Sequence, residues 1–407
     1  MDVLQIEDMI ICRHLVADEM VQAVSSLCEG MEPDSKAAGM LIAQAERLGL
    51  SGNIWQQYLL QRLCDGDNVA AATVERTGTY GAGLVAAVGE DMKILLPFLQ
   101  AKASALFGYA FLDSYTPAAP RHSECRAALA QALGGSTSPQ ECARLLLEHY
   151  RQYGSGPMAE YMAFRVRSDG GLVGIEEFPH YEWDDLLGYD HQKSRLLANT
   201  VNFIEGREAN NVLLTGARGT GKSTGVKALV YRYHDQGLRL VQVGRSQLSG
   251  LAQLMERLAE IRSRKFILFL DDLSFDEDEK EYKYLKSAID GGVSPQPPNV
   301  LLYATSNRRH LLKETWKDRS DEQDEVYRDD STNESISLSD RFGLILHYAT
   351  PTQDEYLQII DHELRKAGVC LDAHELRIQG LRWEMEHSGR NGRIAQQFVK
   401  WYLGNRK

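Results

Sequence analysis

The chain has 407 residues, of which 43% are hydrophobic and 25% are charged, and this ordinary globular composition argues against a disordered or fibrous protein. Its length allows two or three domains of roughly 100–200 residues each. The net charge of -12 argues against nonspecific coating of nucleic acid, which needs a basic surface, and leaves only a local basic groove open.

The cysteines and the N-terminus indicate a cytoplasmic protein. The six cysteines form no C-x-x-C pair, so we expect buried free thiols rather than a disulfide framework or a zinc site. The N-terminus carries Asp2 and Glu7 and lacks the basic start of a secretory signal. An apolar stretch at 94–112 approaches membrane-spanning length, but Pro97 interrupts it, so we expect a buried helical core and no membrane span.

The chain before residue 183 predicts two segments. Residues 1–155 predict a mainly helical domain of unknown role, because apolar residues recur at helical spacing, as from Ala38 to Leu48, where Gly49 follows as a stop signal. Residues 156–182 predict a linker with a short β-hairpin, because the β-prone runs MAFRV and LVGIE flank an Asp-Gly-Gly turn.

The rest of the chain alternates between apolar strands and helices and then becomes helical. Residues 183–350 predict an α/β domain with a parallel sheet covered on both faces. Its five expected strands lie at 212–215, 238–243, 266–270, 300–304 and 344–348, with helices at 223–233, 251–262 and 279–290. Residues 351–407 predict a small helical domain, opened by the capping box TQDE, with helices at 352–366, 375–387 and 393–403.

The segment GARGTGKS matches the phosphate-binding pattern G-x-x-x-x-G-K-[ST] between a predicted strand and a predicted helix. Glycines let backbone amides curl around phosphate oxygens, and the helix adds its positive dipole end. Lys222 would neutralise the β- and γ-phosphates, and Ser223 would ligate Mg²⁺. A Gly-rich turn that binds nothing is the alternative, but chance produces the pattern in only about one or two per cent of such chains. The predicted ATP-binding residues are Gly216, Ala217, Arg218, Gly219, Thr220, Gly221, Lys222, Ser223 and Thr224.

A pair of acids follows the expected strand at 266–270. A phosphoryl-transfer ATPase needs an acid at the tip of a neighbouring strand. We therefore predict that Asp271 holds Mg²⁺ and that Asp272 activates water. An apolar strand that ends in Asp is a weak signal alone, and the complete phosphate loop upstream gives it weight. The acidic run at 276–279 predicts a solvated helix start instead.

Together these motifs resemble the AAA+ ATPases, and more narrowly the bacterial DUF815 family of ATP-binding proteins. The resemblance covers residues 183–398 and rests on the strings WDDLLGYDHQK, NNVLLTGARGTGKS, FILFLDDLSF, YATSNRRHL and SLSDRFGL. It implies a P-loop NTPase fold in which the parallel five-stranded sheet is followed by a small C-terminal helical lid. The mainly helical N-terminal domain lies outside it.

The resemblance implies roles for further residues. Leu187, Gly188 and Tyr189 match the segment that lines the adenine pocket. Asn307 matches the sensor-1 residue that holds the attacking water, and the alternative is a helix-capping or turn asparagine.

Two arginine motifs also match the family. In SDRFG, Arg341 matches the arginine finger, which reaches the γ-phosphate on a neighbouring subunit and implies a homo-oligomer with nucleotide. An intramolecular ion pair with Asp340 or a loop carboxylate is the alternative. In GRNGRIAQQF, Arg393 matches the sensor-2 residue, and Arg390 is the second choice.

Asp272 departs from the family pattern, which usually has a glutamate there. The side chain is one methylene shorter, and a displacement near 1 Å can cost on the order of a hundredfold in rate. We therefore predict slow basal hydrolysis that a partner raises. The acidic insertion at 318–334 predicts an exposed loop that could dock on a basic partner, although a solvated loop is the simpler interpretation.

The implied function is a Mg-ATP-dependent ATPase that oligomerises and remodels an unidentified protein or nucleic-acid partner. A nucleotide-dependent switch or scaffold with negligible turnover is one alternative, and Asp272 favours it. A helicase-loader-like DNA-processing ATPase is another, but its support is thin: the basic RSRK at 262–265 with Arg308 and Arg309. A small-molecule kinase ranks last, because it should lack the sensor and finger residues.

Overall fold

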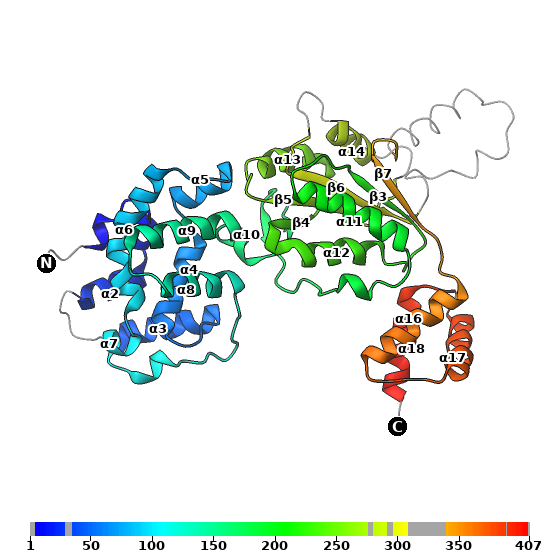
Figure 1. Ribbon diagram of the computed structural model, residues 1–407, viewed down its shortest axis with the longest axis horizontal. Coiled ribbons are helices and arrows are strands. Elements are labelled where there is room, and N and C mark those ends of the chain that lie inside the picture. The colour runs from blue at the N-terminus through cyan, green and yellow to red at the C-terminus, as the bar shows by residue number, and fades with distance from the viewer. Residues whose placement is uncertain are drawn as a thin grey trace. The chain divides into compact units, whose positions relative to one another are not determined.

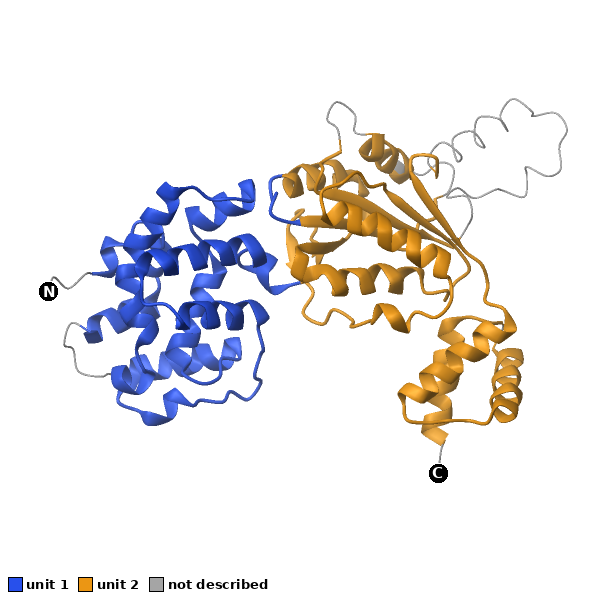
Figure 2. Ribbon diagram, in the orientation of Figure 1, with its two compact units in different colours: residues 1–161, 260–264 blue, residues 162–259, 265–407 orange. Residues whose placement is uncertain are grey.

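The computed structural model of this chain describes residues 5–28, 35–275, 280–290, 296–307, 339–387 and 389–405 (Figure 1). The chain divides into two compact units (Figure 2): Met1–Tyr161 with Glu260–Arg264, and Met162–Ala259 with Lys265–Lys407. The predicted acidic segments at 276–279 and 318–334, and Arg308 and Arg309, lie outside the described residues. Among the described helices, none combines the length and the apolar character that crossing a bilayer requires.

The first unit is helical, as predicted. Its elements are η1 Ile6–Asp8, α1 Arg13–Val16, α2 Glu19–Cys28, α3 Ser35–Leu48, α4 Ile54–Asp65, α5 Val69–Thr77, α6 Ala82–Gln100, α7 Ala103–Phe107, η2 Ala110–Asp113, α8 Glu124–Gly134, α9 Pro139–Tyr153 and α10 Pro157–Glu160. The apolar stretch at 94–112 contributes Leu95, Phe107 and Leu112 to the core, in agreement with the prediction of a buried helical core.

The second unit contains a seven-stranded sheet in the order β2-β1-β4-β5-β6-β3-β7. The strands are β1 Ala163–Val166, β2 Leu172–Gly174, β3 Val212–Gly216, β4 Leu238–Gln242, β5 Lys265–Leu270, β6 Val300–Ser306 and β7 Leu344–Tyr348. All neighbouring strands are parallel except β1 and β2, which form an antiparallel pair. The predicted parallel α/β fold is therefore confirmed.

The predicted number of five strands is wrong, because β1 and β2 extend the sheet beyond β4. β1 pairs in parallel with β4, with Phe164 opposite Val241. Ala163 and Phe164 are fully buried, so this pairing both adds to the core and covers an edge that β4 would otherwise expose. The pairing joins segments far apart in the chain, which local sequence patterns do not report.

α-Helices and short 3-10 helices connect the strands of the sheet and cover it. They are η3 Trp183–Asp185, α11 Asp190–Ile204, α12 Lys222–Tyr233, η4 His234–Gln236, η5 Arg245–Gly250, α13 Leu251–Ala259 and α14 Lys280–Asp290. Residues of α11 and α12 share one core with alternate residues of the strands, such as Leu214 and Phe269. The intervening residues Leu213 and Leu268 are buried as well, as expected for strands covered on both faces.

Three helices follow the last strand and form the lid: α16 Gln353–Lys366, α17 Ala373–Glu386 and α18 Gly392–Asn405. They enclose a small core that includes Tyr356, Leu364 and Phe398. The predicted capping box is present, since Thr352 N donates to Glu355 Oε2 at 2.7 Å and Glu355 N donates to Thr352 Oγ1 at 3.3 Å. This box fixes where the lid begins.

Candidate functional site

The loop at 217–221 connects β3 directly to α12, as the motif predicts. Gly216 has φ +128°, and a Cβ there would lie 1.9 Å from the carbonyl oxygen of Tyr348 on β7. Only glycine fits this approach. Gly221 has φ +86° and precedes the first residue of α12. The chain therefore turns sharply and presents the amides of the loop and of the helix N-terminus to one space, which is a favourable site for an anion.

Lys222 is buried in this loop, with 6% of its surface exposed. Its Nζ donates to Gly216 O at 2.8 Å and to Ala217 O at 2.7 Å. Burial lowers the pKa of Lys222, and the nearby charges of Asp271 and Asp272 oppose that shift. The amine is thus held within the curl of the loop, where a phosphate oxygen would exchange with the carbonyl partners.

Asp271 meets two hydroxyl groups from different elements. Ser223 Oγ, from the first turn of α12, and Thr305 Oγ1, from β6, both donate to Asp271 Oδ1 at 2.6 Å. Hydroxyl and carboxylate oxygens are the ligands that Mg²⁺ prefers. The contact between Ser223 and Asp271 brings together the two residues that the sequence assigns to the metal.

Asp272 has φ +57°, a left-handed conformation that is uncommon outside glycine and better tolerated by aspartate than by most residues. Three contacts from the end of β6 hold it. Its amide donates to Thr305 Oγ1 at 2.9 Å, and Leu273 N donates to Thr305 O at 2.7 Å. Asn307 Nδ2 donates to Asp272 Oδ1. The turn therefore places the Asp272 carboxylate beside Asn307.

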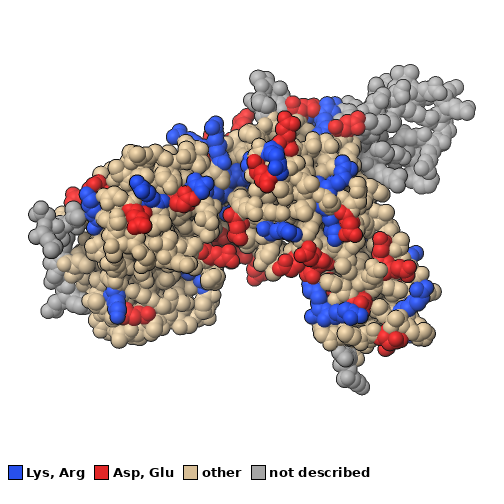
Figure 3. Space-filling model, in the orientation of Figure 1, with Lys and Arg blue, Asp and Glu red and all other residues tan. Residues whose placement is uncertain are grey.

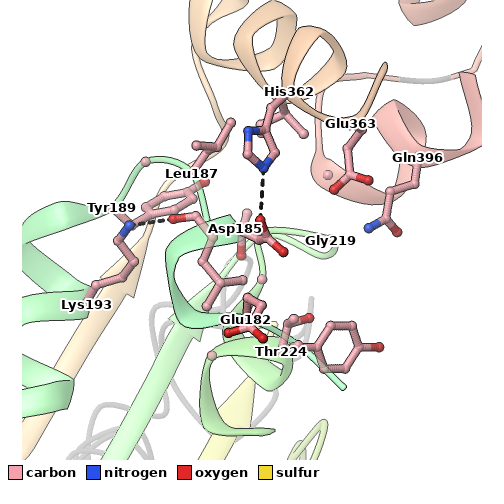
Figure 4. Close-up of a pocket in the computed structure, with 18 of the residues that line it drawn as sticks. Glu182, Asp185, Leu187, Tyr189, Lys193, Gly219, Thr224, His362, Glu363 and Gln396 are labelled. Carbon is pink, nitrogen blue, oxygen red and sulfur yellow. Dashed lines mark hydrogen bonds and ion pairs between the residues drawn. The ribbon is translucent and has the colours of Figure 1, made fainter. Parts of the chain in front are cut away.

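Two cavities adjoin the loop and share Gly219, Thr220, Gly221, Thr224 and Arg393. The smaller has a volume of about 380 Å³ and contains the loop, the acidic pair, Thr305 and Asn307. The larger has a volume of about 510 Å³ and extends from residues 180–189 to the lid (Figure 4). The smaller cavity is polar enough for phosphates and a cation, and the larger has room for a nucleoside.

The predicted adenine segment lines the larger cavity with Leu187, Gly188 and Tyr189. Tyr189 is fixed there, because its hydroxyl donates to Ala349 O at 2.6 Å and its ring lies 4.9 Å from that of Tyr348. The segment therefore lies at the junction between the sheet and the lid.

The predicted arginines have different surroundings. Arg393 lines both cavities, whereas Arg390 forms an ion pair with Glu384 on the lid at 2.8 Å and lines neither. Arg341 also lines neither cavity and forms an ion pair with Asp290, at the end of α14. Within this chain, only Arg393 of the three is placed to meet a ligand.

The lid contacts the site at two places that the sequence did not predict. Gly392 N, at the start of α18, donates to Gly219 O in the loop at 2.9 Å. Asp185 accepts from His362 Nε2 at 3.2 Å (Figure 4) and also from Lys366 Nζ, and both donors lie on α16. These hydrogen bonds, that of Lys366 first, lower the pKa of Asp185.

Sequence signals for these contacts exist but are weak. His362 and Lys366 are four residues apart and so share one helix face, and Asp185 lies in the quoted string WDDLLGYD. Thr305 likewise belongs to the string YATSN and lies two positions before Asn307. None of these patterns indicates which residue the side chain will contact, because that residue lies in another part of the chain.

The residues present fit a nucleoside triphosphate with Mg²⁺. The loop offers amides and a buried ammonium group, and Ser223 with Asp271 offers hard oxygen ligands. Arg393 adds a second positive charge at the point where the two cavities meet. The positive charges and amides at one end of the site complement the negative charge of a triphosphate, and the larger cavity at the other end has room for a nucleoside.

A family model described as "Protein of unknown function (DUF815)" matches residues 159–406. Among the curated proteins, none matches the chain. Solved structures that match include the Thermotoga maritima RuvB Holliday junction branch migration motor, at 20% identity and a TM-score of 0.37, over 55% of this chain and 64% of that one. The match thus spans less than two thirds of RuvB.

Two further structures match over 55% of this chain. The FIGL-1 AAA domain in complex with ADP matches at 18% identity and a TM-score of 0.37, over 74% of its length. The C. elegans protein PCH-2 matches at 16% identity and a TM-score of 0.36, over 65% of its length.

Proposed function

This chain belongs to the DUF815 family, and we propose that it is an ATPase of the AAA+ type that binds ATP with Mg²⁺ and hydrolyses it slowly to remodel a macromolecular partner. The observation that carries the proposal is the meeting of Lys222, the Ser223–Asp271 pair and the Asn307–Asp272 pair around one cavity. These residues come from three strand ends, and their convergence is what phosphoryl transfer requires.

Binding is assigned to the loop and its neighbours. Backbone amides of the loop and the ammonium group of Lys222 would hold the phosphates, and Leu187, Gly188 and Tyr189 would face the base. Ser223 and Asp271 would hold Mg²⁺, which supplies positive charge to the transferring phosphoryl group when bound. Arg393 would add charge from the lid.

Hydrolysis is assigned to Asp272 and Asn307. The Asp272 carboxylate would accept a proton from the attacking water, and Asn307 would orient that water or the carboxylate. The contact between them supports slow turnover, because Asn307 and a water molecule compete for the same short carboxylate.

Assembly is the third part of the proposal. Arg341 is assigned to the nucleotide of a neighbouring copy, and the ion pair with Asp290 would then have to exchange for it. Size analysis of the purified chain with and without Mg-ATP tests this. We expect a larger species only with nucleotide, and an Arg341→Ala variant that still binds ATP but loses any turnover gained on assembly.

A nucleotide-dependent switch is the second candidate, and the engagement of Asp272 by Asn307 favours it. A DNA-processing loader has less support. Arg264 of the RSRK segment is buried, with 1% exposed, and donates to Arg151 O and Ser263 O. On the face in Figure 3, acidic and basic side chains of the described residues are interspersed rather than gathered into a basic surface.

The decisive experiment measures ATP affinity of the full chain with Mg²⁺ by calorimetry. Lys222→Ala should weaken binding by about tenfold or more, since it removes charge-assisted hydrogen bonds. Lys227→Ala is the matched control, because it lies on the same helix and lines neither cavity. Absence of ATP binding by the wild-type chain would overturn the proposal, and binding without turnover would favour the switch.

A further inference from the structure

The lid lies directly against the phosphate-binding loop at Gly219. Gly219 O accepts from the backbone amide of Gly392, the first residue of α18, at 2.9 Å. Gly219 has φ +75°, and a Cβ at this position would lie 2.5 Å from Asn391 Oδ1 and 2.8 Å from Asn391 Cγ. The phosphate-binding pattern itself needs no glycine here, since residue 219 is one of its variable positions. The backbone conformation and the Asn391 side chain, which occupies the space of a Cβ, explain this glycine.

Asn391 also determines where α18 begins. Its Oδ1 accepts from Ile394 N at 3.0 Å, which is the hydrogen bond of a helix N-cap, and its backbone oxygen accepts from Ala395 N at 3.0 Å. The preceding residue, Arg390, is held on α17 by its ion pair with Glu384 at 2.8 Å. Asn391 is therefore attached to the lid on both sides while its side chain lies against the loop.

The position of Arg393 depends on this arrangement. Its side chain is exposed, and it forms no hydrogen bond or ion pair with another residue that the structure describes. The backbone at the first turn of α18 therefore sets where the guanidinium group can reach. Arg393 lines the smaller cavity together with Asp272 and Asn307, at the end assigned to water activation. An arginine in this place meets the γ-phosphate of ATP, which ADP lacks.

We propose that Asn391 is a positioning residue for Arg393. Packed against Gly219, it holds the first turn of α18 at the phosphate-binding loop, so that Arg393 reaches the γ-phosphate. Asn391 itself lines neither cavity and acts through the backbone that follows it. The inference rests on the proposed function, because it needs ATP in the site, and it gives the lid a defined part in distinguishing ATP from ADP.

A cap that only stabilises the lid predicts a different pattern of nucleotide binding. The larger cavity extends from residues 180–189 to the lid, so a loosened lid would weaken the binding of ATP and ADP alike. A displaced Arg393 weakens the binding of ATP alone, because ADP has no γ-phosphate for it to contact. The ratio of the two affinities therefore separates positioning from stability.

The test measures ATP and ADP affinities of the full chain with Mg²⁺ by calorimetry, for the wild type, Asn391→Ala, Arg393→Ala and the double variant. Arg393→Ala should weaken ATP binding by about tenfold and ADP binding by less than about twofold, since it removes a charge-assisted hydrogen bond. Asn391→Ala should weaken ATP binding by about fivefold alone, and by less than about twofold when Arg393 is already absent. Equal effects in both backgrounds, or on both nucleotides, would refute the inference while the proposed function stands. A wild-type chain without ATP affinity would remove both.

Two further variants complete the design. Asn391→Gly keeps a residue that caps helices nearly as well but leaves no side chain against Gly219. It should unfold close to the wild-type midpoint and share the ATP defect of Asn391→Ala, whereas normal ATP affinity would show that the contact with the loop has no part. Asn405→Ala, at the other end of α18, is the matched control and should leave both affinities unchanged. Far-ultraviolet circular dichroism checks folding, and the cycle of Asn391→Gly with Arg393→Ala decides the question if Asn391→Ala does not fold.

Discussion

Thr305 Oγ1 lies 2.6 Å from Asp271 Oδ1, so the acidic residue at the end of β5 is fixed by a hydroxyl from the neighbouring strand β6. The same oxygen accepts from Asp272 N at 2.9 Å. One hydroxyl therefore sets the direction of the Asp271 carboxylate and stabilises the left-handed turn at Asp272.

Thr305→Val should raise the Mg²⁺ concentration needed for half-maximal turnover by about tenfold, because it removes a hydrogen bond to a charged group worth about 1.5 kcal/mol. ATP affinity in EDTA should change less than about twofold. Thr305→Ser keeps the hydroxyl and should restore the Mg²⁺ dependence. An unchanged Mg²⁺ requirement in Thr305→Val would show that the hydroxyl does not position Asp271, while ATP binding by the wild type still stands as a separate result.

Asp272→Asn should retain ATP affinity and reduce turnover by about 10²-fold or more, because the amide cannot accept the proton from water. We expect the wild-type chain alone to turn over below about 1 s⁻¹, at the low end for enzymes. Steady-state phosphate release checks both values. Asp235→Asn is a surface control, since Asp235 lies on η4 and lines neither cavity. Brisk turnover by Asp272→Asn would remove this carboxylate from the mechanism.

The contact of Asp185 with Lys366 and His362 should stabilise the fold in a pH-dependent way. The pKa of Asp185 is lowered from its ordinary value of 3.8, so the folded protein favours the carboxylate. This stabilisation is fully present above 3.8 and is lost as the pH falls through the lowered pKa.

Asp185→Asn should therefore lower the thermal midpoint by about 1–3 °C, because partly exposed ion pairs contribute little. The difference from the wild type should shrink as the pH falls below the ordinary Asp185 pKa of 3.8. Asp361→Asn, which breaks the exposed pair with Arg365, is the control and should change the midpoint less. A difference that grows as the pH falls below 3.8 would contradict the assigned sign.

Gly216→Ala should destabilise the second unit by at least about 2 kcal/mol, because the φ of +128° strains an alanine and its Cβ would lie 1.9 Å from Tyr348 O. That contact is with backbone, which cannot move aside without disturbing β7. Gly250→Ala, where a Cβ meets nothing within 4 Å, should change stability by less than about 0.5 kcal/mol. Urea unfolding without nucleotide measures both, and equal midpoints would refute the steric argument.

Local patterns in the sequence were sufficient for much of the fold. The five predicted strands and the lid helices lie within a few residues of their expected places, because runs of buried apolar residues and capping signals act on neighbours in the chain. The phosphate loop is similarly local, since its glycines, Lys222 and Ser223 occupy one turn between β3 and α12. The conformation of one continuous segment is set largely by the residues within it, so local patterns predict it.

Only the tertiary structure decided which distant residues meet. β1 joins the sheet through β4, Arg393 rather than Arg390 lines the cavities, and Arg341 pairs with Asp290. Thr305 reaches Asp271 through the register of the neighbouring strands β5 and β6. Such contacts depend on how whole elements stack, and many pairings are compatible with one pattern of apolar residues. The sequence by itself therefore determined the loop, whereas packing determined its partners.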